Sequence, residues 1–228
     1  MIHAISVDMA FANVGLARLD IWPGGIGNPE KFIKVQDLQL LSTEAGNKKL
    51  VRVSSDDLRR VLEIADGLRD FVAVDTSFAF VEVPSGAQDA KAARALGMAT
   101  GLLGVLHVLG IPIIEVSPGE VKATVTGKPK VKASKAEIIA WASKRWPDAP
   151  WLRYARDGKV VTKPKKGPPK VTAWKAGELR NDNEHLADAL AIATAGVKTP
   201  AFQQALALYH ATTGSHRQRP ASGRVSLD

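Results

Sequence analysis

The chain has 228 residues, a formal net charge of +8 at pH 7 and no cysteine. This length fits one large domain, or one domain with an insertion, and 45% hydrophobic residues is typical of a globular chain rather than a disordered one. The absence of cysteine excludes disulfides and thiolate metal sites. The positive charge favours a polyanionic partner, with nucleic acid first and an anionic membrane surface second.

No segment of the sequence has the character of a targeting signal or a membrane span. Residues 1–8 lack a basic region and reach Asp8 too soon for a signal peptide. The most apolar stretch, residues 101–109, is interrupted by His107 and is too short to cross a bilayer. We therefore expect a soluble protein of the cytoplasm with no membrane partner.

The N-terminal part of the chain predicts an antiparallel meander of three strands. Residues 2–7 have the apolar character of a buried strand, which Asp8 closes. Residues 14–21 are expected to form its hairpin partner. Residues 32–41 are expected to form the third strand, after a loop rich in glycine and proline at residues 22–29.

A helix and a central strand follow the meander. Ser54 or Ser55 is expected to begin the helix, and the side chains expected to face the sheet are Leu58, Val61, Leu62, Ala65 and Leu68. Residues 78–84 form an apolar run typical of a central strand, and Glu82 lies inside it. An unpaired carboxylate there costs several kcal/mol, so Glu82 must meet a cation, a metal ion or a proton. A buried salt bridge is the purely structural alternative.

The middle of the chain predicts further helices and one short strand. A long helix spans residues 87–109 and contains Gly97, Gly101 and Gly104. Each glycine costs roughly 1 kcal/mol of helix stability relative to alanine, which predicts close approach of another element along that side. The remaining elements of this region are a buried strand at residues 111–116 and helices at residues 117–126 and 134–146.

The composition changes at about residues 147–180, which we interpret as a basic insertion into a single domain of residues 1–210. Residues 151–161 are expected to form a hairpin around the turn Asp157-Gly158, followed by a stiff basic loop. The side chains suited to gripping DNA backbone and stacking on unpaired bases are Lys163, Lys165, Lys166 and Lys170, with Trp151, Tyr154 and Trp174. Alternatively, the aromatic residues anchor a basic loop to its own domain. Residues 200–210 predict a last helix, and residues 211–228 predict a disordered basic tail.

Residues 183–194 predict a helix with an imidazole and a carboxylate on one face. His185 and Asp188 are three positions apart and therefore lie one helical turn apart. A separate stripe of leucine and alanine can pack on a core. Taken alone, two such polar residues are more often ordinary surface groups, so a functional interpretation needs partners from elsewhere. Asp8 and Glu82, two acids in apolar surroundings, are the available partners.

The order of the predicted elements allows these residues to meet. The meander is followed by parallel strands, which places the first and fourth strands side by side at the sheet centre. On the β period Asp8 shares a face with Ser6, and Glu82 shares a face with Phe80. The late helix could then cover both carboxylates. Oxygen ligands with one imidazole suit Mg²⁺ or Mn²⁺, and two such ions can support phosphodiester hydrolysis.

Four segments in this order resemble the motifs of RuvC-type Holliday junction resolvases of the RNase H-like superfamily. They are Ser6-Val7-Asp8 with Gly15, Phe80-Val81-Glu82 with residues 96–101, residues 116–127, and residues 184–193. The resemblance covers about residues 2–146 and 181–196. It implies an α/β fold in which helices flank a mixed five-stranded sheet, made of a three-strand antiparallel meander plus parallel strands.

The resemblance also implies an activity and a set of site residues. The activity is that of a crossover junction endodeoxyribonuclease that acts as a homodimer on four-way junctions and other branched DNA, with two Mg²⁺ or Mn²⁺ ions per active site. The implied metal ligands are Asp8, Glu82, His185 and Asp188. Lys122 would lie near the scissile phosphate, and Lys135 is a further candidate for DNA contact, unless it is a solvated surface charge. Glu184 is expected to point elsewhere on its helix.

Two features depart from the family pattern, and other functions stay open. Members of the family often carry a junction-wedging aromatic residue shortly after the second acid, where this chain has Pro84-Ser85-Gly86, and the short bacterial form lacks the insertion. Such divergent members are typical of phages and prophages, which would place the protein in the cytoplasm of a bacterial host. The alternatives are an RNase H-fold nuclease for flaps, forks or RNA, and a non-catalytic protein that binds branched DNA.

Overall fold

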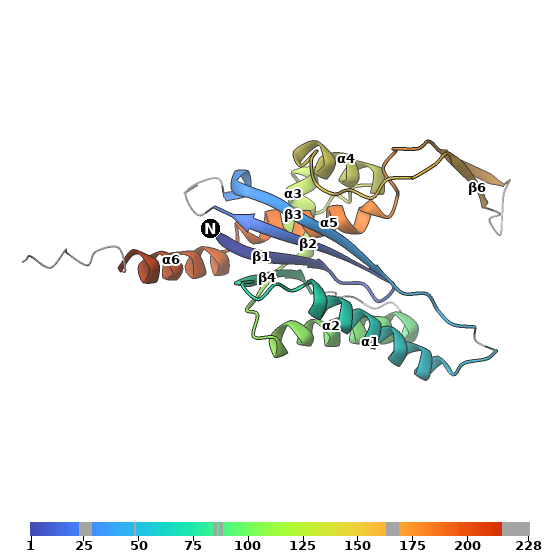
Figure 1. Cartoon of the computed structure of the whole chain (residues 1–228), viewed down its shortest axis with the longest axis horizontal. Helices are drawn as coiled ribbons and strands as arrows, with labels where there is room; N and C mark the ends of the chain where they lie inside the picture. The colour runs from blue at the N-terminus through green and yellow to red at the C-terminus, as the bar shows by residue number, and fades with distance from the viewer. Residues whose placement is uncertain (23–28, 48, 84–85, 87–88, 163–168, 216–228) are drawn as a thin grey trace, which may run out of the picture.

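A mixed five-stranded sheet lies at the centre of the molecule, and helices cover both of its faces (Figure 1). The computed structural model describes residues 1–22, 29–47, 49–83, 86, 89–162 and 169–215. Its central strands are β1 (Ile2–Asp8), β2 (Asn13–Ile21), β3 (Ile33–Ser42), β4 (Phe78–Glu82) and β5 (Ile113–Val116). Their order is β3-β2-β1-β4-β5, with β1, β2 and β3 antiparallel and β1, β4 and β5 parallel. The predicted α/β fold, with the first and fourth strands adjacent, is therefore confirmed.

The helices form one layer on each side of the sheet (Figure 1). On one side lie α1 (Val53–Phe71) and α2 (Ala90–Val108), and on the other lie α3 (Pro118–Thr126), α4 (Lys135–Arg145) and α5 (Asn183–Gly196). A 3-10 turn (Pro29–Phe32) precedes β3, and α6 (Pro200–Ser215) extends away from the sheet. Within the described ranges, no helix is long and apolar enough to cross a membrane.

Strand alternation divides the apolar residues into two cores. Ile5 and Val7 of β1 belong to the core under α1 and α2, whereas Ala4 belongs to the core under α5. The same alternation continues to the end of the strand, so that Ser6 and Asp8 face α5. Glu82 at the end of β4 shares that face with Phe80. Two carboxylates therefore lie at the ends of neighbouring strands, on the side that α5 covers.

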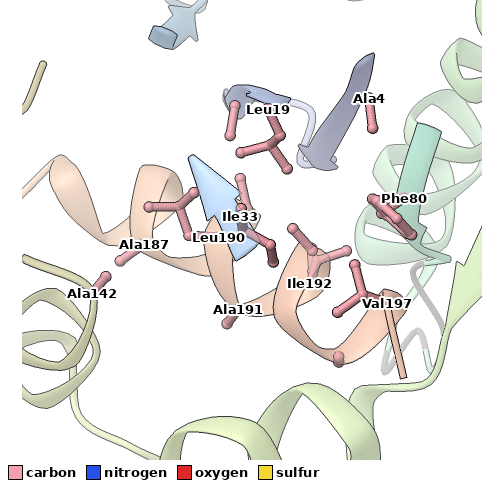
Figure 2. Close-up of a cluster of buried hydrophobic side chains, with 14 of the residues drawn as sticks. Ala4, Leu19, Ile33, Phe80, Ala142, Ala187, Leu190, Ala191, Ile192 and Val197 are labelled. Atoms are coloured by element: carbon pink, nitrogen blue, oxygen red, sulfur yellow. The ribbon is translucent and has the colours of Figure 1, made fainter. Parts of the chain in front are cut away.

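Helix α5 packs across all five strands of the sheet and is the most deeply buried helix of the described chain. Figure 2 shows Leu190 and Ile192 of α5 directed toward side chains of the strands, among them Ile33 and Phe80. Small side chains allow the helix backbone to come close, and the hydroxyl of Ser6 donates a hydrogen bond of 2.6 Å to the carbonyl oxygen of Ala189. The helix is thereby held at a fixed position over β1.

Capping boxes begin the two helices that flank α5, as the Ser-x-x-Glu spacing in the sequence favours. The side chain of Ser117 caps α3 by accepting from the backbone N–H of Glu120, and the Glu120 carboxylate accepts from the backbone N–H of Ser117. Ser134 and Glu137 make the same reciprocal pair at the start of α4. The starts of α3 and α4 are thus determined locally.

The insertion differs from its predicted form. Its strands are β6 (Gly158–Thr162) and β7 (Lys170–Trp174), which pair with each other in a separate ribbon. Residues 151–161 therefore do not form the predicted hairpin, and Lys170 starts a strand instead of ending a loop. Gly158 lies at the start of β6 instead of in the expected turn, and the ring of Trp174 covers it. A Cβ at this position would lie 2.6 Å from that ring. Lys163, Lys165 and Lys166 lie outside the described residues.

The aromatic residues of the insertion anchor it to the domain. Trp151 is buried, and its indole N–H donates to the carbonyl oxygen of Trp146 at 2.8 Å. The rings of Tyr154 and Trp174 stack on each other with centroids 4.7 Å apart. The buried ring of Trp151 is therefore an anchor and not a platform for unpaired bases, whereas base stacking by the half-exposed rings of Tyr154 and Trp174 stays a prediction.

Helix α1 lies on the sheet as predicted and packs Val61, Ala65 and Leu68 against the core, but part of its predicted face is exposed. Leu58 and Leu62 of α1 are 58% and 55% exposed, whereas Arg60 is buried. Arg60 lies over the ring of Phe11 and donates to the carbonyl oxygen of Phe11 and the hydroxyl of Thr43, and these contacts turn the helix away from the leucine face. The helix also begins at Val53, without a serine cap.

The glycines of α2 do not accommodate a neighbour within the described chain. A Cβ built at Gly97, Gly101 or Gly104 would meet no atom within 4 Å, so the predicted close approach is wrong. The side chains that α2 buries are Ala99, Leu102, Leu103 and Leu106. At the other end of the chain, α6 continues to Ser215, beyond the predicted end at residue 210, and residues 216–228 of the predicted tail lie outside the described part.

One buried side chain joins α5 to the insertion and leads to a first prediction. The Asn183 side chain accepts from the N–H of Leu152 at 2.9 Å and donates to the carbonyl oxygens of Leu152 and Arg180 at 2.7 and 2.9 Å. Because truncation leaves buried backbone groups unpaired, we expect Asn183→Ala to lower the free energy of unfolding by about 2–3 kcal/mol, measured by urea denaturation. The exposed neighbour Asn181 provides the control, and equal urea midpoints for Asn183→Ala and Asn181→Ala would contradict the assignment.

Candidate active site

Two carboxylates from neighbouring strands line one cavity at the edge of the sheet. Val7 pairs with Val81 in the parallel ladder, so the residues that follow them, Asp8 and Glu82, lie side by side. Both line a cavity of about 660 Å³ that α3, α4 and α5 surround. Because parallel strands end at the same edge of a sheet, the predicted meeting of the two acids follows directly from the topology.

Helix α5 adds two further carboxylates to the cavity. Asp188 lines it, as predicted, and Glu184 lines it as well. The prediction that Glu184 points elsewhere is therefore wrong. Glu184 and Asp188 are four positions apart and share a helix face, a signal that was present in the sequence. The Glu184 carboxylate forms an ion pair with Lys135 at the start of α4, so it faces the rim of the cavity.

His185, a predicted metal ligand, does not line the cavity itself and contacts the site through Asp8. Its Nδ1 lies 3.0 Å from Oδ2 of Asp8, a hydrogen bond in which the imidazole N–H donates and the carboxylate accepts. Gly15 is the cross-strand partner of Asp8, and a Cβ there would lie only 2.0 Å from the carbonyl oxygen of His185. The lack of a side chain at Gly15 therefore lets the first turn of α5 rest on the strand and brings the imidazole to Asp8.

The environment of the cavity disfavours the charged form of its carboxyl groups. Burial, reinforced by the negative charge of Asp8, raises the pKa of Glu82, and Lys122 opposes this shift. Burial also raises the pKa of Asp188 from 3.8 to about 7, with further contributions from Asp8 and Glu184. The hydrogen bond to Asp8 raises the pKa of His185, against the effect of its burial. Several carboxyl groups therefore share a partly desolvated space without enough positive charge to balance them.

Lysines line the rim of the same cavity. Lys122 projects from α3 and Lys135 from α4, and both line the cavity, while the DNA contacts that the resemblance implied for them stay predictions. Lys132, just before α4, lines it too and was missed. The available signal was the density of lysine between α3 and α4, where four lysines occur within residues 128–135. Of the lysines expected in the insertion, Lys170 lies on β7, in the ribbon outside this cavity.

The donor chemistry of the cavity suits a hard divalent cation. Asp8, Glu82 and Asp188 offer carboxylate oxygens, the ligands that Mg²⁺ and Mn²⁺ prefer. The pKa values of Glu82 and Asp188 are raised because these groups are buried next to other negative charges. A bound cation would neutralise those charges and so remove the cause. Within the described residues, no three side chains of histidine, aspartate or glutamate are gathered closely enough to hold one ion. The residues therefore fit a metal ion in type and charge, and would have to draw together around it.

The topology and the position of the cavity define the fold class as RNase H-like. Among solved structures, the chain is similar to the RuvC of Thermus thermophilus in complex with a Holliday junction substrate, with a TM-score of 0.51 and 18% sequence identity over 86% of this chain and 92% of that chain. A second structure of Thermus thermophilus RuvC has a TM-score of 0.49 and the same identity, over 93% of this chain and 97% of that one. No protein-family model and no curated protein sequence matches the chain. The likeness shows a RuvC-like fold.

The close contact at Gly15 gives a second prediction. Because an added Cβ would meet helix backbone, which no side-chain rotation can relieve, we expect Gly15→Ala to lower the free energy of unfolding by about 2 kcal/mol or more. Gly101→Ala on α2, where a Cβ meets open space, is the matched control and should raise stability by about 0.5–1 kcal/mol. Urea unfolding measures both. Equal midpoints for the two variants would show that α5 does not rest on β2 at this point.

The raised pKa of Asp188 gives a third prediction, for the metal-free protein. Between pH 4 and about 7 the folded state binds more protons at Asp188 than the unfolded state, so stability falls as pH rises through this window and levels off above it. The penalty at pH 8 is at most about 4 kcal/mol. We expect Asp188→Asn to melt at a higher temperature than the wild type at pH 8 in the presence of a chelator, and at a similar temperature near pH 4. A lower melting temperature for Asp188→Asn at pH 8 would contradict this origin of the shift.

Proposed function

We propose that the chain is a metal-dependent, structure-selective endodeoxyribonuclease that nicks branched DNA, with four-way junctions as its main substrate. The observation that supports this most is the convergence of Asp8, Glu82 and Asp188, from three separate elements, on one cavity rimmed by lysines. Phosphodiester hydrolysis by metal ions needs carboxylates that bind the ions and cationic side chains that bind the phosphate, and this cavity has both. The RuvC-like fold supports the same proposal, since the similar Thermus thermophilus protein was solved with a Holliday junction substrate.

Each side chain has a role in this proposal. Asp8, Glu82 and Asp188 would hold Mg²⁺ or Mn²⁺, with two ions per active site. When bound, these ions would supply an activated water and neutralise charge at the leaving oxygen. His185 keeps Asp8 oriented through the Nδ1 hydrogen bond, which leaves Nε2 as the imidazole nitrogen that could bind a metal ion.

The lysines on the rim bind the DNA backbone. Lys122 lies close enough to the carboxylates to affect the pKa of Glu82, so a phosphate contacted by Lys122 is held next to the metal-binding groups. Lys135 is kept at the rim by its ion pair with Glu184. Paired nicks across a four-way junction need two such cavities, and each chain contributes one; we therefore propose that a homodimer is the active form. Pro84 and Ser85, which stand where the family often has a junction-wedging aromatic residue, lie outside the described residues.

A nicking assay with a carboxylate variant tests the proposal. On a synthetic four-way junction, with fork, flap and duplex controls, the wild type should nick only with Mg²⁺ or Mn²⁺. Asp8→Asn removes a charged ligand, so nicking should fall at least about a hundredfold while junction binding is retained. Asp66→Asn, an exposed carboxylate on α1 at the opposite face of the sheet, is the control and should cut like the wild type.

Two results would contradict the proposal in different ways. Normal cutting by each of Asp8→Asn, Glu82→Gln and Asp188→Asn would show that the catalytic site lies elsewhere. Junction binding by the wild type without any metal-dependent nicking would identify the chain as a DNA-binding protein that retains the fold. Preferred cutting of flaps, forks or RNA would keep the site and change the substrate.

A further inference from the structure

The positive charge of the chain is concentrated in the insertion. Residues 147–180 contain nine lysine and arginine residues and three acidic residues, a net charge of +6 out of +8 for the whole chain. The remaining residues are thus nearly neutral as a group. A polyanion approaching the protein is therefore attracted to this segment as well as to the lysines around the cavity.

The described part of the insertion is a projecting two-stranded ribbon. Figure 1 shows β6 extending from the domain beyond α4, well away from the central sheet. In the pairing register, Val161 faces Val171 across the ribbon, and Val160 faces Thr172 on the opposite face. The three valines are 49–57% exposed. Branched apolar side chains on both faces of an isolated ribbon are not explained by packing within the described chain, because neither face is covered.

The base of the ribbon is fixed to the helix that carries the candidate site. Tyr154 stacks on Trp174 at the end of β7, and the backbone N–H of Tyr154 donates to the backbone carbonyl oxygen of Glu178. Leu152 is held by the buried Asn183 side chain, at the first position of α5, one residue before Glu184. The ribbon is therefore held in a defined position relative to the cavity by buried hydrogen bonds and stacked rings.

We propose that the β6–β7 ribbon is an arm that enters a groove of duplex DNA next to the cleavage site. A two-stranded ribbon has the width that the major groove of B-DNA admits. In this position Lys159 and Lys175 contact phosphates along the groove edges, and Val161 and Val171, which share one face of the ribbon, contact base edges and thymine methyl groups on its floor. Charge complementarity favours DNA over a protein partner, since lysine is depleted at the cores of protein interfaces. The inference rests on the proposed function, which supplies the branched DNA whose arm the ribbon holds.

Equilibrium binding to a four-way junction across a series of salt concentrations tests this arm. The full-length protein carries Asp8→Asn in all samples, so that binding is measured without cleavage. The double variant Lys159→Ala/Lys175→Ala should bind about tenfold more weakly, and the slope of log K against log salt should fall by about two because two lysines no longer bind phosphate. The control is Lys31→Ala/Lys34→Ala, which removes the same charge next to Ile33, at the end of the sheet away from Asp8. This variant should change neither the affinity nor the salt slope.

The apolar contacts are tested separately. Val160→Ser/Val161→Ser/Val171→Ser changes exposed side chains only, so the fold is retained, and circular dichroism checks this. This variant should weaken binding several-fold while leaving the salt slope unchanged, because every lysine that binds phosphate is kept. Light scattering on the same samples reports the oligomeric mass.

The possible failures are distinguishable. If both ribbon variants keep the wild-type affinity and salt slope, the ribbon does not bind DNA and the inference is wrong, even if the protein cuts junctions as proposed. A changed oligomeric mass with unchanged DNA binding would show that the valines contact a second protein chain instead, and would also overturn it. Loss of binding in the ribbon variants, in a protein whose wild type never nicks DNA, would support the arm while contradicting the proposed nuclease function.

Discussion

The close seating of α5 on the sheet is the contact on which the rest of the structure depends. At Gly15 there is no room for a single methyl group between β2 and the backbone of the helix, and Gly196 is equally restricted by the ring of Phe80. Between these points the Ser6 hydroxyl bonds to the helix backbone itself. Backbone contact of this kind determines both the height and the rotation of α5. These in turn decide which of its side chains reach the carboxylates at the ends of β1 and β4.

The cavity formed in this way is electrostatically unfavourable without a cation. Burial and mutual repulsion raise the pKa of Glu82 and Asp188, and the positive groups nearby compensate only in part. Lys122 opposes the shift at Glu82, whereas Lys135 is already paired with Glu184 at the rim. A folded protein tolerates such an arrangement because the two apolar cores on either side of the sheet supply the stability that the cavity lacks. This demand for positive charge is the reason why we propose a divalent metal ion at this point.

Helix α5 connects the two regions of the molecule that we propose bind DNA. Its first residue, Asn183, holds the base of the basic insertion, and its next turn presents Glu184 and Asp188 to the cavity. A polyanion held by the insertion is therefore held in a fixed relation to the carboxylates. This arrangement also explains the use of aromatic residues in the insertion, since Trp151 and the Tyr154–Trp174 pair act as packing anchors and make the attachment rigid.

Local patterns determined a large part of this fold. The two-residue period of the strands was enough to place Asp8 and Glu82 on one face, and α3 and α4 begin where helices were predicted at residues 117–126 and 134–146. These features depend on neighbours in the chain. The strand order was also predicted correctly, since the succession of a meander and parallel strands leaves few arrangements open.

Only the tertiary structure decided how each helix is rotated about its axis and which distant segments pair. Arg60, rather than Leu58, is buried in α1, because Phe11 and Thr43 offer it partners from another part of the chain. Glu184 joins the cavity and His185 turns to Asp8, because the contact at Gly15 sets the rotation of α5. The sequence by itself thus determined which elements form and which acids lie at the sheet edge. Helix rotation and the pairing of the ribbon were decided only by packing, because a helical or strand period repeats identically whatever surface it meets.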